Sequence, residues 1–127
     1  MTTAENDLEY LATLARLSLA TAAQLDQFAE LSMRTIRIVV LNALRMRQIA
    51  AADAEDVAQE AILRAFKYLP KWKAERAKWA TYLSRLTATA IGEQRRQYAR
   101  QARAVAIARE LQRDRLPDND NTPTEKQ

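Results

Sequence analysis

Three carboxylates near the middle of the chain, Asp53, Asp56 and Glu60, come closest to a chemical site by type and spacing. Residues three or four positions apart share one face of a helix, so Gln59 would lie beside Asp56 and Glu60. Such carboxylates can hold a hard cation. A solvated helix start explains them more simply, because the helix dipole favours negative charge there. We therefore assign no metal and no cofactor.

Catalytic chemistry is poorly supported by the composition. The chain contains no His and no Cys, which removes the commonest general base, a common nucleophile and the usual transition-metal ligands. No catalytic residue is assigned, and an enzyme is the least favoured class. The lack of Cys excludes disulfides and favours a cytoplasmic protein. No run of residues approaches the ~18 apolar residues of a membrane span, so we expect no membrane partner.

The carboxylates belong to a predicted helix that starts at Asp53 and ends at Pro70. Asp53 is a good N-cap residue, and Pro70 cannot continue a helix. Apolar residues recur at helical spacing and predict the buried face. These residues are Val57, Ala61, Ile62, Ala65, Phe66 and Leu69. The opposite face, with Asp56, Gln59 and Glu60, is acidic.

The remaining elements are also helical. One Gly and three Pro among 127 residues favour an all-α protein, a compact bundle of four to five helices. We predict a first helix from Glu5, a break at 18–21 with a capping box between Thr21 and Gln24, and a second helix over 22–48. A basic connector at 71–73 is expected to leave Trp72 partly exposed.

A further helix is expected from Glu75, with Trp79 mainly in the core. The sole glycine, Gly92, predicts a bend before a final basic helix that reaches about Arg115. We expect one helical domain over 1–116, made of an extra N-terminal segment at 1–29, a central part at 30–103 and an extension at 104–116. The Pro- and Asn-rich residues 117–127 predict a disordered tail.

Charge is unevenly distributed along the chain. Residues 1–61 hold 5 Lys/Arg and 9 Asp/Glu, a net charge of −4, whereas residues 62–116 hold 14 and 4, a net charge of +10. An acidic half and a basic half suggest two surfaces with different partners, the basic one suited to nucleic acid. Ordinary solvated helix faces are the simpler alternative.

Three motifs resemble region 2 of the sigma-70 family of bacterial sigma factors, and nearest its extracytoplasmic-function branch. Residues 53–60, DAEDVAQE, are similar to the family's D-x-E-D-hydrophobic-x-Q-E signature. Residues 78–83, KWATYL, resemble the aromatic-x-Thr-aromatic start of the family's next helix. The pair Arg95-Arg96 and the arginines after it resemble the basic end of that helix.

The resemblance implies two partners, core RNA polymerase and promoter DNA. In the family the first motif docks on the clamp helices of the largest polymerase subunit. The polymerase-binding residues implied here are Asp53, Asp56, Gln59, Glu60 and Leu63. The other motifs help to open and grip the promoter −10 element. The DNA-binding residues implied here are Lys78, Tyr82, Arg85, Arg95, Arg96, Arg100 and Arg103.

The sequence also departs from the family pattern. Thr89 and Glu93 stand where extracytoplasmic-function members usually have Asn and Asp. We expect a stand-alone region 2 without region 4, the module that reads the −35 element, as in half of a split sigma factor or a phage or mobile-element regulator. Its further partner would be an anti-sigma factor or a second sigma-like subunit.

These observations favour a sigma region 2-like transcription regulator that binds core RNA polymerase and contacts −10 DNA. One alternative is a decoy that occupies polymerase or an anti-sigma factor and inhibits without reading a promoter. Another is a small helical DNA-binding or oligomerisation module.

Overall fold

The structure is a computed structural model that describes residues 3–115, with side-chain exposure described for residues 7–114. The expected tail at 117–127 lies outside the described residues. The described chain is all-α, as predicted. Its elements are α1 (Thr3–Arg16), α2 (Ala22–Arg45), the 3-10 turn η1 (Ala51–Asp53), α3 (Ala54–Tyr68), the 3-10 turn η2 (Leu69–Lys71) and α4 (Trp79–Arg115).

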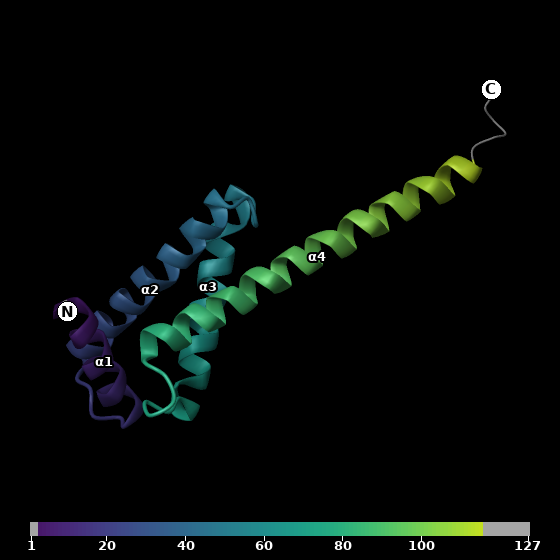
Figure 1. The fold of residues 1–127 in the computed structure, drawn as a ribbon. Coiled ribbons are helices and arrows are strands. Elements are labelled where there is room, and N and C mark those ends of the chain that lie inside the picture. The colour runs from purple at the N-terminus through teal and green to yellow at the C-terminus, as the bar shows by residue number, and fades with distance from the viewer. Residues whose placement is uncertain (1–2, 116–127) are drawn as a thin grey trace. The chain divides into compact units, whose positions relative to one another are not determined.

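The chain divides into two units between Gln94 and Arg95, so the described residues fall into a first unit, 3–94, and a second unit, 95–115. In the first unit α2 packs against both α1 and α3 (Figure 1). In the second unit every described side chain, from Arg95 to Asp114, is exposed. None of the described helices combines the length and apolar content that a membrane-spanning helix needs.

The corner between α1 and α2 forms as predicted from local sequence. Gln24 N donates to Thr21 Oγ1 at 3.1 Å, and Thr21 N donates to Gln24 Oε1 at 2.9 Å, which is the expected capping box. The break before it is confirmed, with Ser18 in the left-handed region at φ 60°. At its other end α2 stops at Arg45, and Arg47 takes a left-handed turn conformation at φ 58°.

The core of the first unit centres on Trp79, which is fully buried as expected. Its indole Nε1 donates to Ser32 Oγ at 3.0 Å, and its ring lies 5.4 Å from that of Phe28. Ser32 is also fully buried, so this bond satisfies two polar groups that would otherwise destabilise the interior. The first turn of α4 is thereby fixed against α2.

Phe66 was expected on the buried face of α3, but 38% of it is exposed. Its ring still stacks on Phe28, with centroids 5.7 Å apart. Phe66 therefore lies at the rim of the core, because the smaller residues Ala61 and Ala65 bring α3 close to its neighbours and fill the centre of the buried face.

The prediction that Trp72 is partly exposed was wrong, since only 2% of it is exposed. Trp72 Nε1 donates to Ala77 O at 2.9 Å, and its ring meets the Trp79 ring edge-on at 5.4 Å. The lysines on either side suggested a solvated connector. The connector instead folds its aromatic ring inward while the charges remain outside.

The prediction of a bend at Gly92 was also wrong, because α4 continues through it, and α4 starts at Trp79 rather than Glu75. The hydroxyls of Thr87 and Thr89 donate to the carbonyl oxygens of Leu83 and Arg85, four residues earlier, at 2.7 and 3.0 Å. These bonds satisfy the threonines within the helix. Ala88 and Ala90 favour helix on either side.

Candidate functional site

One face of α3 presents the residues of the first motif to solvent. Asp56, Gln59, Glu60 and Leu63 are all exposed and lie at i, i+3, i+4 and i+7. Leu63 is 64% exposed, unusual for a leucine in the middle of a helix that packs on a core. We call these four residues the docking face. Among the residues that the structure describes, Asp56 makes no hydrogen bond or ion pair.

Asp53, the first residue of the motif, is less exposed than the four residues of the docking face. It is half-buried, its Oδ2 atom is buried without a hydrogen-bond partner among the described residues, and it makes no capping bond to α3. The prediction of an N-cap was wrong because η1 runs directly into α3. This connection holds Asp53 at φ −96° and ψ −8°, and an N-cap residue needs an extended backbone.

Glu55 organises the edge of the docking face, a role that the sequence reading missed. One of its oxygens, Oε2, accepts from Gln59 Nε2 and from Arg37 Nη2 of α2, each at 3.0 Å. The hydrogen bond from Gln59, and then that from Arg37, lower the pKa of Glu55. The Gln59 amide is thus held with its carbonyl oxygen available to a partner.

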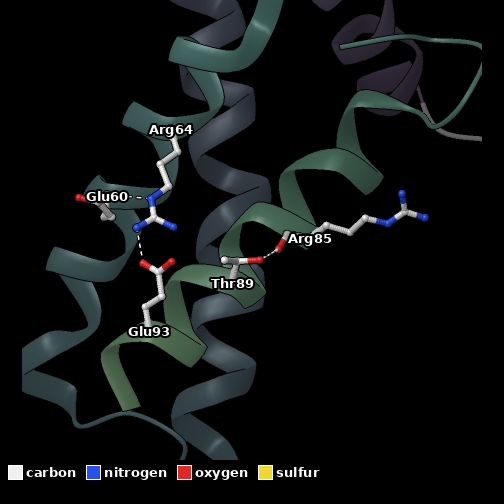
Figure 2. Close-up of polar contacts among 5 residues, drawn as sticks. All are labelled: Glu60, Arg64, Arg85, Thr89 and Glu93. Carbon is white, nitrogen blue, oxygen red and sulfur yellow. Dashed lines mark hydrogen bonds and ion pairs between the residues drawn. The ribbon is translucent and has the colours of Figure 1, made fainter. Parts of the chain in front are cut away.

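Arg64 links the docking face to α4 (Figure 2). Its Nε donates to Glu60 Oε2 at 2.8 Å, and its Nη2 donates to Glu93 of α4. The hydrogen bonds to Glu93 and then to Glu60 raise the pKa of Arg64 above its ordinary value. With a side chain only 25% exposed, Arg64 is held between two carboxylates. An open groove of about 610 Å³ between α3 and α4 includes these three residues in its lining.

The connector and the start of α4 form a basic hollow of about 260 Å³. Its lining combines four cationic side chains with two aromatic rings and an alanine. The lining residues are Lys71, Trp72, Lys73, Arg76, Ala77, Tyr82 and Arg85. Of these, only Tyr82 and Arg85 were predicted as DNA-binding residues. The sequence signal for the others was the basic run over 71–76, in which Trp72 stands between two lysines.

Tyr82 forms the aromatic side of the basic hollow. It is half-buried, and its ring lies 5.5 Å from that of Trp79. Burial, with a smaller contribution from nearby Tyr68, raises the pKa of Tyr82. The neutral phenol is therefore the form present near neutral pH, and it offers both a hydrogen-bond donor and a flat surface.

The other predicted DNA-binding residues are divided between the two units. Lys78 is exposed just before α4 in the first unit. The remaining four are exposed within the second unit. These residues are Arg95, Arg96, Arg100 and Arg103.

The two residues that depart from the family pattern are engaged within the fold (Figure 2). Thr89 Oγ1 donates to Arg85 O at 3.0 Å, and Glu93 is paired with Arg64. Their polar groups already have partners when no other molecule is bound. Within the described part of the chain, no group of three or more acidic residues is arranged to hold a metal ion.

The first unit is thus all-helical and carries an acidic face on α3 and a basic hollow at the connector and the start of α4. The family model for sigma-70 region 2 matches residues 33–104, more than half of the chain. The chain therefore belongs to the sigma-70 region 2 family, whose members are transcription-factor domains. No curated protein and no solved structure matches it. The match begins within α2, so α1 lies outside it.

Proposed function

We propose that this protein binds core RNA polymerase through the docking face, on the clamp helices of the largest subunit. The observation that carries the proposal is the exposure of Asp56, Glu60 and Leu63 on one face of α3 in a member of this family. An exposed apolar side chain with carboxylates around it is typical of a protein-binding surface. A partner with arginines around an apolar patch would complement it.

The docking face is only partly satisfied within the protein. Asp56 is available for a charge-assisted hydrogen bond, and the Gln59 carbonyl oxygen is available as an acceptor. Glu60 is shared with Arg64, so a partner arginine would have to compete for it. The free-energy cost of this exchange is small, because Arg64 keeps its ion pair with Glu93 when Glu60 binds a partner arginine.

We further propose that the protein contacts DNA through the basic hollow and through the arginines of the second unit. Four cationic side chains around one hollow supply the positive potential that attracts phosphates. Tyr82 supplies a surface on which a base can stack. The 21 residues from Arg95 to Arg115 include 7 Arg and only 2 acidic residues, Glu110 and Asp114.

A second candidate function is a decoy that occupies polymerase without reading a promoter. The internal bonds of Thr89 and Glu93 favour it. A side chain that is already hydrogen-bonded within the protein must lose that bond before it can bind a base edge, which lowers the net gain in free energy. The two candidates share the docking face. They differ in whether transcription starts.

The docking proposal is tested by reversing charge at the docking face. Asp56→Lys with Glu60→Lys should weaken binding to purified core polymerase by at least about 30-fold, because each lost charge pair would face a like charge. Asp26→Lys with Glu30→Lys is the matched control. Those residues are also exposed, lie four positions apart, and include a glutamate paired with an arginine, Arg34, four residues on. Equal binding by both double variants would refute the docking face.

In vitro transcription separates the two candidates. The protein is added to core polymerase with and without a host sigma factor, on a pool of promoter fragments. New transcripts without the host factor would identify an initiating sigma factor. Loss of host-factor transcripts with no new ones would identify a decoy. Indifference in both reactions, with no binding to polymerase, would contradict both.

A further inference from the structure

The first helix, α1, supplies the negative charge at the positive end of α4. Glu9 Oε1 accepts from Trp79 N at 2.7 Å, and Glu9 Oε2 accepts from Ala80 N at 3.1 Å. The first backbone N–H groups of a helix have no partner within the helix, and the helix dipole favours an anion there. One carboxylate therefore binds both N–H groups, although it lies seventy positions away in the sequence.

The same helix also contacts the far side of the connector. The Arg16 guanidinium lies 5.9 Å from the centre of the Trp72 ring, and α1 contacts η2. Trp72 in turn packs edge-on against Trp79 and donates to Ala77 O. Both ends of the 72–79 segment are thus held by α1, at Trp72 by Arg16 and at Trp79 by Glu9.

The segment between these two points forms much of the basic hollow. Lys73 and Arg76 come from it, and Lys71 and Arg85 flank it. The hollow brings like charges together, and their repulsion would open the segment unless it were held at its ends. Glu9 is the residue best placed to hold it, because it binds the backbone directly and lies outside the cation cluster.

We infer that Glu9 is a positioning residue, which holds the 72–79 segment in the conformation that receives DNA at the basic hollow. The inference rests on the proposed DNA contact and extends it to a helix outside the family match. Glu9 touches no DNA itself. Its effect on affinity comes from the fraction of molecules in which the hollow is formed.

The test compares Glu9→Gln with Asp26→Asn in the full chain. Both changes remove one negative charge, and Asp26 is exposed on α2 and far in sequence from the connector. Removing an acidic charge by itself should strengthen binding to a polyanion. We expect Asp26→Asn to bind DNA more tightly than the wild type and Glu9→Gln to bind it more weakly. The affinity of Glu9→Gln for a fluorescein-labelled DNA oligonucleotide with a single-stranded segment should be weaker than that of Asp26→Asn by ~threefold or more at low salt.

Tryptophan fluorescence supplies a second measurement. The only two tryptophans, Trp72 and Trp79, both belong to the held segment. Glu9→Gln should shift their emission to the red and increase quenching by acrylamide, with unchanged helical circular dichroism. If Glu9→Gln fails to fold, Glu9→Asp, which keeps the charge but is one methylene shorter, should show the same loss of affinity and the same shift.

The outcomes separate this inference from the proposed function. If the wild type binds the oligonucleotide and Glu9→Gln binds as tightly as Asp26→Asn, the positioning role is refuted and the DNA contact stands. If the wild type does not bind at low salt, alone or with core polymerase, the DNA contact and the inference fall together. Unchanged tryptophan emission in both Glu9 variants would also refute the positioning role.

Discussion

At the scale of single residues, the acidic residues at the start of α3 separate into distinct roles. Asp56 is exposed and without an ion pair among the described residues, whereas Glu55 is held by Arg37 and Gln59. Asp53 is half-buried and does not cap the helix. The three acidic residues of the motif therefore differ in the folded protein. The Asp56 carboxylate is available to a partner, Glu55 is bonded within the protein, and Asp53 is partly buried.

Phe66 and Phe28 provide a residue-scale prediction about the core. Phe28 is 2% exposed and Phe66 is 38% exposed, although their rings stack. Phe28→Ala should lower the free energy of unfolding by about 3–5 kcal/mol, as expected for a buried ring. Phe66→Ala should lower it by only about 1–2 kcal/mol, because less surface is removed from the interior.

Urea denaturation followed by circular dichroism measures both changes. The ratio of the two losses is more informative than either value, since both variants remove the same side chain. Equal losses would mean that the exposed edge of Phe66 is covered in solution, and the position of α3 would then need revision.

At the scale of elements, the capped start of α2 was predictable from neighbouring residues, whereas the start of α4 was not, because a distant residue binds its first N–H groups. The capping box of Thr21 and Gln24 needs only residues three positions apart, and it was predicted from sequence. The start of α4 depends on Glu9, and the burial of Trp72 depends on Trp79. Neither contact leaves a periodic signal in the sequence.

The candidate site followed the same division. The exposed face of α3 could be read from helical spacing, because Asp56, Glu60 and Leu63 repeat at three to four residues. The basic run over 71–76 marks the connector in the sequence, but the hollow itself could not be predicted, because only the fold brings Lys73 and Arg76 together with Tyr82 and Arg85.

The continuity of α4 through Gly92 gives an element-scale prediction. Glycine inside a helix is less favourable than alanine by about 0.5–1 kcal/mol. Gly92 does not have a positive φ, so an alanine can adopt its backbone conformation. Gly92→Ala should therefore raise the free energy of unfolding by about 0.5–1 kcal/mol.

The matched control is Ala88→Gly, at an exposed position one turn earlier in the same helix, which should lower stability by a similar amount. Thermal melting followed at a helical wavelength measures both. A loss of stability in Gly92→Ala would show that a methyl group has no room beside this half-buried glycine, or that the helix bends there in solution.

At the scale of the whole molecule, charge is divided along the chain. Residues 1–61 carry a net charge of −4 and residues 62–116 a net charge of +10. The docking face comes from the acidic part, apart from Leu63, and all the proposed DNA-contacting residues come from the basic part. An acidic surface directs the protein toward a basic partner, and the basic residues favour a polyanion.

The basic part of the chain leads to a prediction about how DNA affinity depends on salt concentration. If Arg96 and Arg100 each contact a phosphate, replacing both with Ala should reduce the slope of log affinity against log salt by ~1.5–2. Arg45→Ala with Arg47→Ala removes the same charge from exposed positions in the acidic part and should leave the slope nearly unchanged. Equal slopes for the two double variants would mean that the affinity depends on net charge alone and that Arg96 and Arg100 make no specific phosphate contacts.

Site-specific crosslinking tests whether the docking face binds the clamp helices of the largest polymerase subunit, as we propose. A photoreactive phenylalanine analogue replaces Gln59 in the docking face or, as the control, Asp26 on α2, and each protein is irradiated with purified core polymerase. We predict a crosslink from position 59 that maps to the clamp helices, and none there from position 26. A crosslink from position 59 to another part of polymerase, or no crosslink at all, would contradict docking on the clamp helices.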